Sequence, residues 1–87
     1  MTKKKKIIRV ARKIRRVLKE AGVKITLPQS VSLTKAFVWG IIPSPEKIGE
    51  ECFHALYNVQ INGVGWDYRP TPLCVKIEKI VEEERIK

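Results

Sequence analysis

Three side chains of the sequence belong to the types that bind soft metal ions: Cys52, His54 and Cys74. A closed zinc site needs four such ligands, so this set is one short. On a helix, positions 52 and 54 point about 200° apart, and their side chains would not converge on one ion. We therefore expect a buried Cys52, an exposed His54, and neither a bound metal nor another cofactor.

Enzymatic chemistry has little support in the sequence. No serine or cysteine stands in a nucleophile motif beside His54, and Gly63-Val64-Gly65 lacks the further glycine and helix of a phosphate-binding loop. The acidic residues Glu46, Glu50 and Glu51 lie near the start of a predicted helix, where the helix dipole and solvent account for them. A core this small also leaves little room for a catalytic pocket. We expect no catalytic residues and no enzymatic activity.

The strongest chemical signal is a concentration of cations near the N-terminus. Residues 1–6 form a basic segment that we predict to be a flexible arm, and six more cations follow on one face of a predicted helix. Arginine can hold phosphate oxygens with two parallel hydrogen bonds, and lysine adds diffuse attraction. The predicted phosphate-contacting residues are Lys3, Lys4, Lys5, Lys6, Arg9, Arg12, Lys13, Arg15, Arg16 and Lys19.

A second candidate contact lies in a segment rich in glycine and proline. Trp66 and Tyr68 stand there beside Arg69. Their rings could stack on unpaired bases, anchor a protein interface, or fold over a sheet edge. We include all three residues in the predicted nucleic-acid contact, although no motif of a known nucleic-acid-binding module is present.

The cations depend on the helix that carries them. From Ile7 to Ala21 the apolar residues recur every three or four positions, which predicts a helix with one apolar stripe. The cations occupy the opposite arc, with Ile8 as the exception. Gly22 follows where a left-handed helix cap is typical.

The rest of the chain gives mixed signals. Apolar residues alternate with polar or small ones over residues 23–27, 30–41 and 73–81, which predicts three strands. Residues 45–57 are predicted to form a second helix, capped by Ser44. Asn62-Gly63 predicts the turn of a hairpin between residues 59–61 and 64–66. Two of these predicted strands, over residues 30–41 and 73–81, could instead be helices. Thr26-x-x-Gln29 resembles a capping box, and Thr71 followed by Pro72 is a typical helix start.

The predicted fold class is therefore α+β, in a single small domain of residues 7–87 that follows the basic arm. The predicted order is α-β-β-α-β-β, with an antiparallel sheet and both helices on one of its faces. If the two rival helices form instead, the domain becomes a mostly helical bundle with one β-hairpin.

Composition excludes several classes of protein. The 87 residues include 18 Lys and Arg against 9 Asp and Glu, and the longest apolar run, Ala36–Ile42, is far shorter than the ~20 residues of a membrane span. Lysines and arginines interrupt any secretory signal, and two cysteines cannot form a disulfide framework, so we expect a cytoplasmic protein. Residues 1–35 carry a net charge of +11 and residues 36–87 carry −2, so the charge is concentrated rather than spread.

These observations favour a small nucleic-acid-binding protein, of DNA or RNA, that contacts the phosphate backbone. A membrane surface is not expected, because the apolar stripe lacks Trp and Phe and is needed for the core. The alternative is a protein-binding adaptor or inhibitor, of the kind that a virus or mobile element encodes, which docks an acidic surface of its partner. A small core also favours a homodimer through an uncovered sheet face or strand edge.

Overall fold

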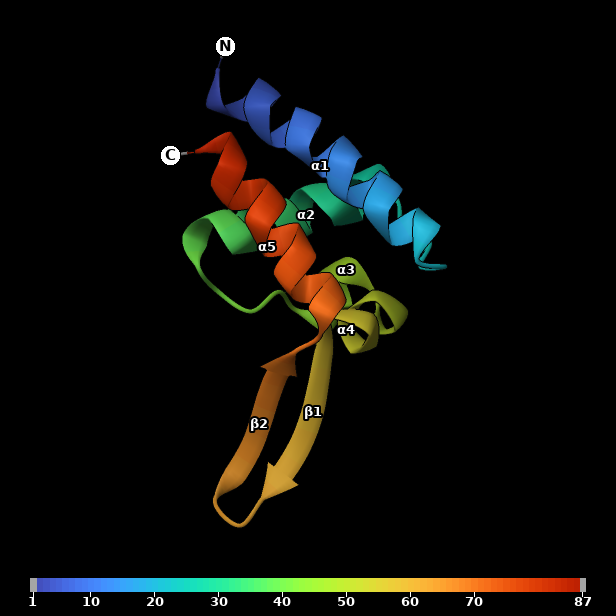
Figure 1. Ribbon diagram of the computed structural model, residues 1–87, viewed down its shortest axis with the longest axis vertical. Coiled ribbons are helices and arrows are strands. Elements are labelled where there is room, and N and C mark those ends of the chain that lie inside the picture. The colour runs from blue at the N-terminus through green and yellow to red at the C-terminus, as the bar shows by residue number, and fades with distance from the viewer. Residues whose placement is uncertain (1, 87) are drawn as a thin grey trace.

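Helices gather at one end of the molecule and a β-hairpin projects from the other, as Figure 1 shows for the computed structural model. The structure describes residues 2–86, and its principal extents are 47 × 26 × 22 Å. The elements are α1 (Lys3–Glu20), α2 (Leu27–Trp39), α3 (Pro45–Ile48), α4 (Glu50–Leu56), β1 (Tyr57–Asn62), β2 (Gly65–Pro70) and α5 (Pro72–Glu84).

Helix α1 begins earlier than predicted. The side chain of Thr2 caps it by accepting a hydrogen bond from the Lys5 backbone N–H, so Lys3–Lys6 form its first turn instead of a separate arm. Lysine is a good helix former, and a threonine cap satisfies one of the free N–H groups at the helix start. The predicted arm also included Met1, which lies outside the described residues. The helix ends before Gly22, which has the left-handed φ of 86°.

The predicted strand over residues 30–41 is wrong, because this segment belongs to helix α2. Thr26 accepts a hydrogen bond from the Gln29 N–H, and the Gln29 side chain accepts one from the Thr26 N–H at 2.9 Å. This capping box and Pro28 in the first turn outweigh the alternation of large and small side chains. Residues 23–26 are likewise a connection between α1 and α2, not the predicted strand.

The predicted last strand, over residues 73–81, is also wrong. Thr71 caps α5 and Pro72 begins it, while Cys74, Ile77 and Val81 recur at helical spacing and are buried. With both segments helical, the predicted four-stranded sheet does not form, and neither does the arrangement of two helices on one sheet face. The chain combines helices with a two-stranded antiparallel sheet, as in the alternative architecture.

The segment between Pro45 and Tyr57 is not the single helix that we predicted. It is divided at Gly49, whose φ of 89° and ψ of 145° are incompatible with a continuous helix. Ser44 caps the first piece, α3, as predicted, by accepting a hydrogen bond from the Glu46 N–H. The second piece, α4, leads directly into β1.

A hairpin forms where it was predicted, but its turn residues are Gly63 and Val64 instead of Asn62 and Gly63, because Asn62 belongs to β1 and pairs with Gly65; its strands are also longer than expected. In its register Val59 pairs with Tyr68, and Ile61 pairs with Trp66. Because facing residues of an antiparallel pair point to the same side, these four side chains share one face of the hairpin. The face is apolar, and the residues between them on the other face are polar.

The core lies between the helices. Helices α1 and α2 contact each other closely within it. Ser30 of α2 is fully buried, and its hydroxyl donates a hydrogen bond to the Ala11 carbonyl oxygen at 2.5 Å. Ala11 is also fully buried, so two small residues meet where the helices touch. Around them pack the large buried side chains Val10, Ile14, Leu18, Leu33, Ile48, Leu56 and Ile77.

This close approach makes position 30 sensitive to size. Ser30→Leu should lower the free energy of unfolding by about 2–4 kcal/mol, because it loses the hydrogen bond and overpacks the contact. Ser32→Leu is the matched control on the same helix, where the side chain is only partly buried, and should change stability by less than about 0.5 kcal/mol. Urea unfolding followed by circular dichroism measures both. Equal effects of the two substitutions would contradict the packing argument.

Candidate nucleic-acid interface

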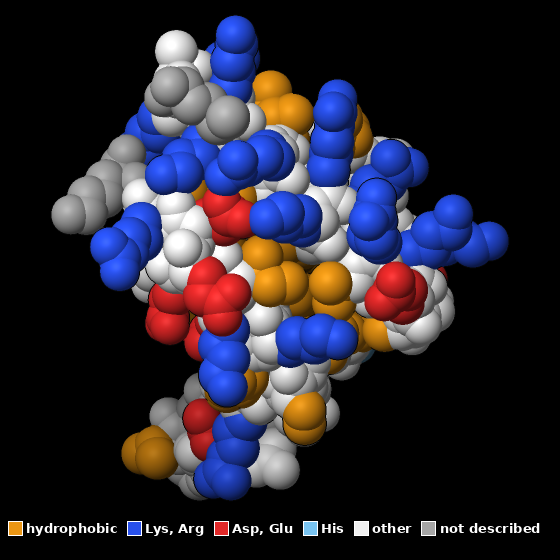
Figure 2. Space-filling view, turned by 45° about the horizontal axis from the view of Figure 1, so that its top comes forward, with side chains coloured by type: hydrophobic (Ala, Val, Ile, Leu, Met, Phe, Trp, Pro, Cys, Tyr) orange, Lys and Arg blue, Asp and Glu red, His pale blue; other side chains and the backbone are white. Residues whose placement is uncertain are grey.

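Helix α1 turns its apolar stripe inward and its cations outward. The stripe residues Ile7, Val10, Ala11, Ile14 and Leu18 are all buried in the core. We call the outward side the cationic face; it comprises Lys5, Arg9, Arg12, Lys13, Arg15, Arg16 and Lys19. Lys3 and Lys4 instead line a separate hollow with Ile7, Ile8, Val31 and Lys35, and Lys6 is partly buried. In Figure 2, lysine and arginine side chains gather over the upper part of the molecule, where α1 lies.

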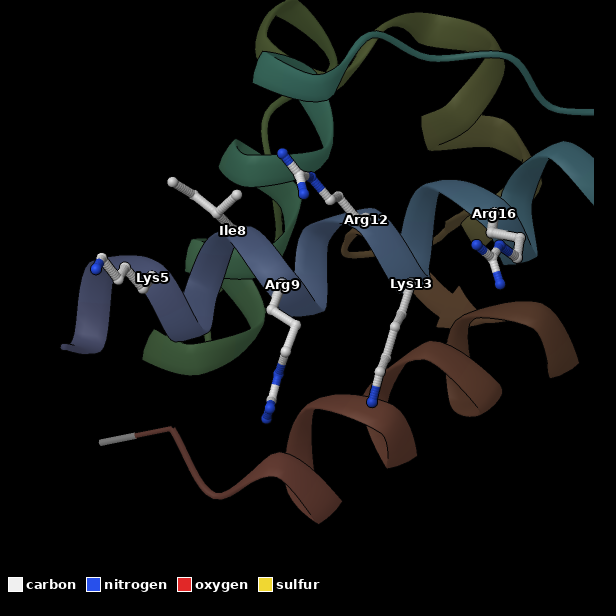
Figure 3. A pocket seen from close by; sticks show the side chains of 6 residues that line it. All are labelled: Lys5, Ile8, Arg9, Arg12, Lys13 and Arg16. Carbon is white, nitrogen blue, oxygen red and sulfur yellow. The ribbon is translucent and has the colours of Figure 1, made fainter. Parts of the chain in front are cut away.

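Two adjoining hollows run along this face. The first encloses about 470 Å³ and is the one in Figure 3, lined by Lys5, Ile8, Arg9, Arg12, Lys13 and Arg16. The second encloses about 420 Å³ between α1 and the start of α2, lined by Arg12, Arg15, Arg16, Lys19 and Leu27. Arg12 and Arg16 belong to both hollows, so the basic surface continues without interruption from Lys5 to Lys19.

Two cations of the face already have an anionic partner. The carboxylate of Glu84, in the last turn of α5, forms ion pairs with the Arg9 guanidinium and the Lys13 ammonium. Figure 3 shows both side chains extending toward α5, whereas Ile8 and Arg12 point away from it. The Glu84 side chain is 15% exposed while its two partners are about half exposed. The hydrogen bond from Lys13, and then that from Arg9, lower the pKa of Glu84.

The partnership with Glu84 was not predicted from the sequence, where Glu82–Glu84 looks like an acidic chain end. Residues 9 and 84 are 75 positions apart, and only the opposite signs of their charges connect them in the sequence. Arg9 and Lys13 were both predicted to contact phosphate. In this structure each can do so only by sharing its charge with Glu84 or by leaving it.

Arg15 has a structural contact as well. Its Nε donates a hydrogen bond to the Ile25 carbonyl oxygen at 3.0 Å, which ties α1 to the connection before α2. The residue remains exposed and lines the second hollow. Arg15 therefore positions the connecting segment and adds to the basic surface.

The first turn of α1 concentrates positive charge. Lys3, Lys4 and Lys5 are exposed, Lys6 is partly buried, and the turn contains no acidic residue. A helix N-terminus carries a partial positive charge of its own, so lysines there meet unfavourable electrostatics that an anion relieves. This end of α1 therefore adds to the positive potential of the cationic face.

The predicted contact residues on the hairpin lie away from α1, at the opposite end of the long axis (Figure 1). Trp66 is 65% exposed, and the Tyr68 ring packs edge-on against Phe53 with 5.9 Å between centroids. Arg69 alternates to the other face of the hairpin, where its Nε pairs with the Asp67 carboxylate at 3.1 Å. The structure therefore does not join these residues and the cationic face into one surface.

The three possible soft-metal ligands, Cys52, His54 and Cys74, differ in their exposure to solvent. Cys52 and Cys74 are buried free thiols, and burial raises the pKa of each to about 11, so both stay protonated at neutral pH. His54 is exposed. Across residues 2–86, no three side chains of His, Cys, Asp or Glu are grouped so that they could hold a metal ion.

No helix within residues 2–86 combines the length and the apolar composition that a bilayer span requires.

The Glu84 ion pairs predict an acid-sensitive contribution to stability. Folding lowers the pKa of the Glu84 carboxyl from its ordinary value of 4.5. The ion pairs therefore contribute their full stabilisation when the pH is above 4.5, and this contribution is lost as the pH falls through the folded-state pKa. Glu84→Gln should therefore lower the Tm by no more than a few degrees at pH 7 and by progressively less below pH 4.5. The neighbouring Glu83→Gln, at an exposed position, is the control for thermal unfolding. A pH-independent difference between Glu84→Gln and the wild type would contradict the ion-pair account.

Comparison with protein-family models, curated proteins and solved structures finds no match to this chain.

Proposed function

We propose that this chain binds nucleic acid by holding the phosphate backbone along the cationic face of α1. The observation that carries the proposal is the continuous basic surface around Arg12, Arg16 and Lys19. Within the described residues these three form no ion pair, and no acidic side chain lines either hollow. Exposed faces that serve solubility alone usually mix charges of both signs.

The length of the surface suits a nucleic-acid backbone. From Lys5 to Lys19 the helix spans about 21 Å at its normal rise. Duplex DNA presents about six phosphates per strand over that length, which is comparable to the number of cations on the face. Arg12 and Arg16, one helical turn apart, can each hold a phosphate with two parallel hydrogen bonds.

The burial of the apolar stripe favours a polyanion, rather than a lipid surface, as the partner of α1. Amphipathic helices that lie on membranes insert their apolar side chains among the lipids. In α1 those side chains are packed in the core, and Ile8 is the one apolar residue within the first hollow. Contacts to phosphate do not depend on the nucleotide sequence, so we propose that the chain binds nucleic acids of different sequence with similar affinity.

Removing the two arginines tests the proposal. Arg12→Gln/Arg16→Gln should weaken binding to a labelled duplex by at least about tenfold at low salt, and should reduce the slope of log K against log salt by about 2. Fluorescence anisotropy over a salt series measures both, with duplex DNA, duplex RNA and single strands as the three probes.

The matched control is Lys76→Gln/Lys79→Gln, which removes the same charge from exposed positions of α5 outside both hollows. It should leave most of the affinity intact. Absence of wild-type binding to all three probes at low salt, or equal losses in the two double variants, would contradict the assignment to α1.

Glu84 should limit the affinity of the cationic face, because it neutralises two of its cations. Glu84→Gln frees Arg9 and Lys13 to contact phosphate, and we expect an affinity gain of about three- to tenfold with a steeper salt dependence. Glu83→Gln makes the same change of net charge on an exposed neighbour and should raise the affinity less. An equal gain from both variants would mean that net charge alone, and not the ion pairs, sets the affinity.

A second candidate function is the binding of an acidic protein surface. The specific observation in its favour is that Arg9 and Lys13 already bind a carboxylate of this chain. Polyglutamate is a direct probe: as a competitor against labelled duplex at equal ionic strength, it should displace the duplex poorly if phosphate is the preferred ligand. Displacement at equal charge concentration would favour the acidic-protein function instead.

A further inference from the structure

Among residues 2–86, no segment covers the outer part of the apolar face of the hairpin β1–β2. Ile61 is 74% exposed and its partner Trp66 is 65% exposed, while Val64 at the tip is 99% exposed. An isolated two-stranded hairpin is marginally stable in water, because it can bury little of its apolar surface. Only its base is anchored, where Tyr57 and Tyr68 pack on Phe53.

An apolar hollow of about 380 Å³ lies beside the base of the hairpin. Phe37, Ile41 and Ile42, from the end of α2 and the loop after it, form one wall, and α5 contributes Val81 with Glu78 and Glu82. The hairpin side of the hollow is formed by Tyr57, Tyr68 and Pro70. Since Tyr68 also belongs to the apolar hairpin face, the face and the hollow form one continuous surface, which we call the apolar surface.

We propose that the apolar surface is the interface of a homodimer, in which the hairpin of each copy lies along that of the other and places Val64 in the partner's hollow. A two-fold interface must be complementary to itself, because the same patch is used by both subunits. This chain carries both required parts, a projecting apolar hairpin and an apolar recess next to it. The inference stands independently of the proposed nucleic-acid binding.

The distribution of charge favours a second copy over a polyanion as the occupant. Glu78 and Glu82 are the charged residues that line the hollow, and they would repel phosphate. Helix α1, which carries the cationic face, lies at the other end of the long axis from the hairpin (Figure 1). Two chains of net charge +9 can therefore join at the apolar surface without bringing their cationic faces together.

The exposed apolar area is large enough to form the centre of an interface. A Trp side chain alone has about 150–250 Å² to bury, and Trp66 is accompanied by Ile41, Ile42, Ile61 and Val64, each more than half exposed. Together they expose several hundred Å² of apolar surface, a patch size that marks interaction sites on soluble proteins. A standard interface takes about 800 Å² from each partner, so in the proposed dimer polar residues around this surface would supply the remainder.

The proposal is tested by the mass of the full chain in solution, measured by light scattering during size-exclusion chromatography. The wild type should have about twice the chain mass of 10.0 kDa. Val64→Asp should weaken the dimer by at least about 100-fold, because an unpaired carboxylate would enter an apolar recess on both sides of the two-fold axis. The side chain of Val64 is fully exposed in one chain, so the substitution should leave the helical circular dichroism unchanged.

The matched control is Val75→Asp, an exposed position of α5 outside the apolar surface, which should stay dimeric. A second readout is the emission of Trp66 in a Trp39→Phe background, which should shift to longer wavelength on dilution and in Val64→Asp. A monomeric wild type at millimolar concentration would overturn the proposal. So would a Val64→Asp variant that dimerises as tightly as the wild type.

Discussion

The burial of one stripe of α1 against α2 and α5 is the constraint on which the rest of the structure depends. A helix whose apolar residues recur every three or four positions can bury only one side, so its remaining residues must face solvent. In α1 those remaining residues are the cations. The close contact between Ser30 and Ala11 fixes how α1 sits on α2. The cationic face is thus a direct consequence of core packing.

The same packing decides which cations are free. It brings the C-terminal end of α5 beside α1 and places Glu84 between Arg9 and Lys13, while Arg15 is drawn toward the Ile25 carbonyl. Arg12, Arg16 and Lys19 form no ion pair within residues 2–86 and keep their charge available. The cations of α1 therefore differ in how much charge they can offer a ligand. Those near α5 or near the connection before α2 already have a partner within the described part of the chain, and the others do not.

Local signals in the sequence predicted the features that one segment determines by itself. The stripe of α1 and the presence of a hairpin near Asn62-Gly63, though not its exact turn, are of this kind, and so is the cationic face, because all its members lie on one helix. The strands predicted over residues 30–41 and 73–81 are wrong because a short alternating pattern of apolar residues fits both a strand and a helix. The caps Thr26 with Gln29, and Thr71 with Pro72, are what decided between them. The Glu84 ion pairs and the apolar surface depend on how distant segments pack, which no local pattern contains.

The two ends of the molecule use different forces, and ionic strength separates them. Salt weakens contacts between cations and phosphate by reducing the gain from counterion release, whereas it leaves the burial of apolar surface largely intact or strengthens it. In the proposed dimer the two cationic faces would lie at the outer ends, away from the apolar seam. Two faces linked in this way raise the effective concentration of the second contact on one nucleic acid, so avidity can exceed the affinity of either face alone. Dimerisation at the apolar end would then strengthen binding at the charged end without adding a single new cation to either chain.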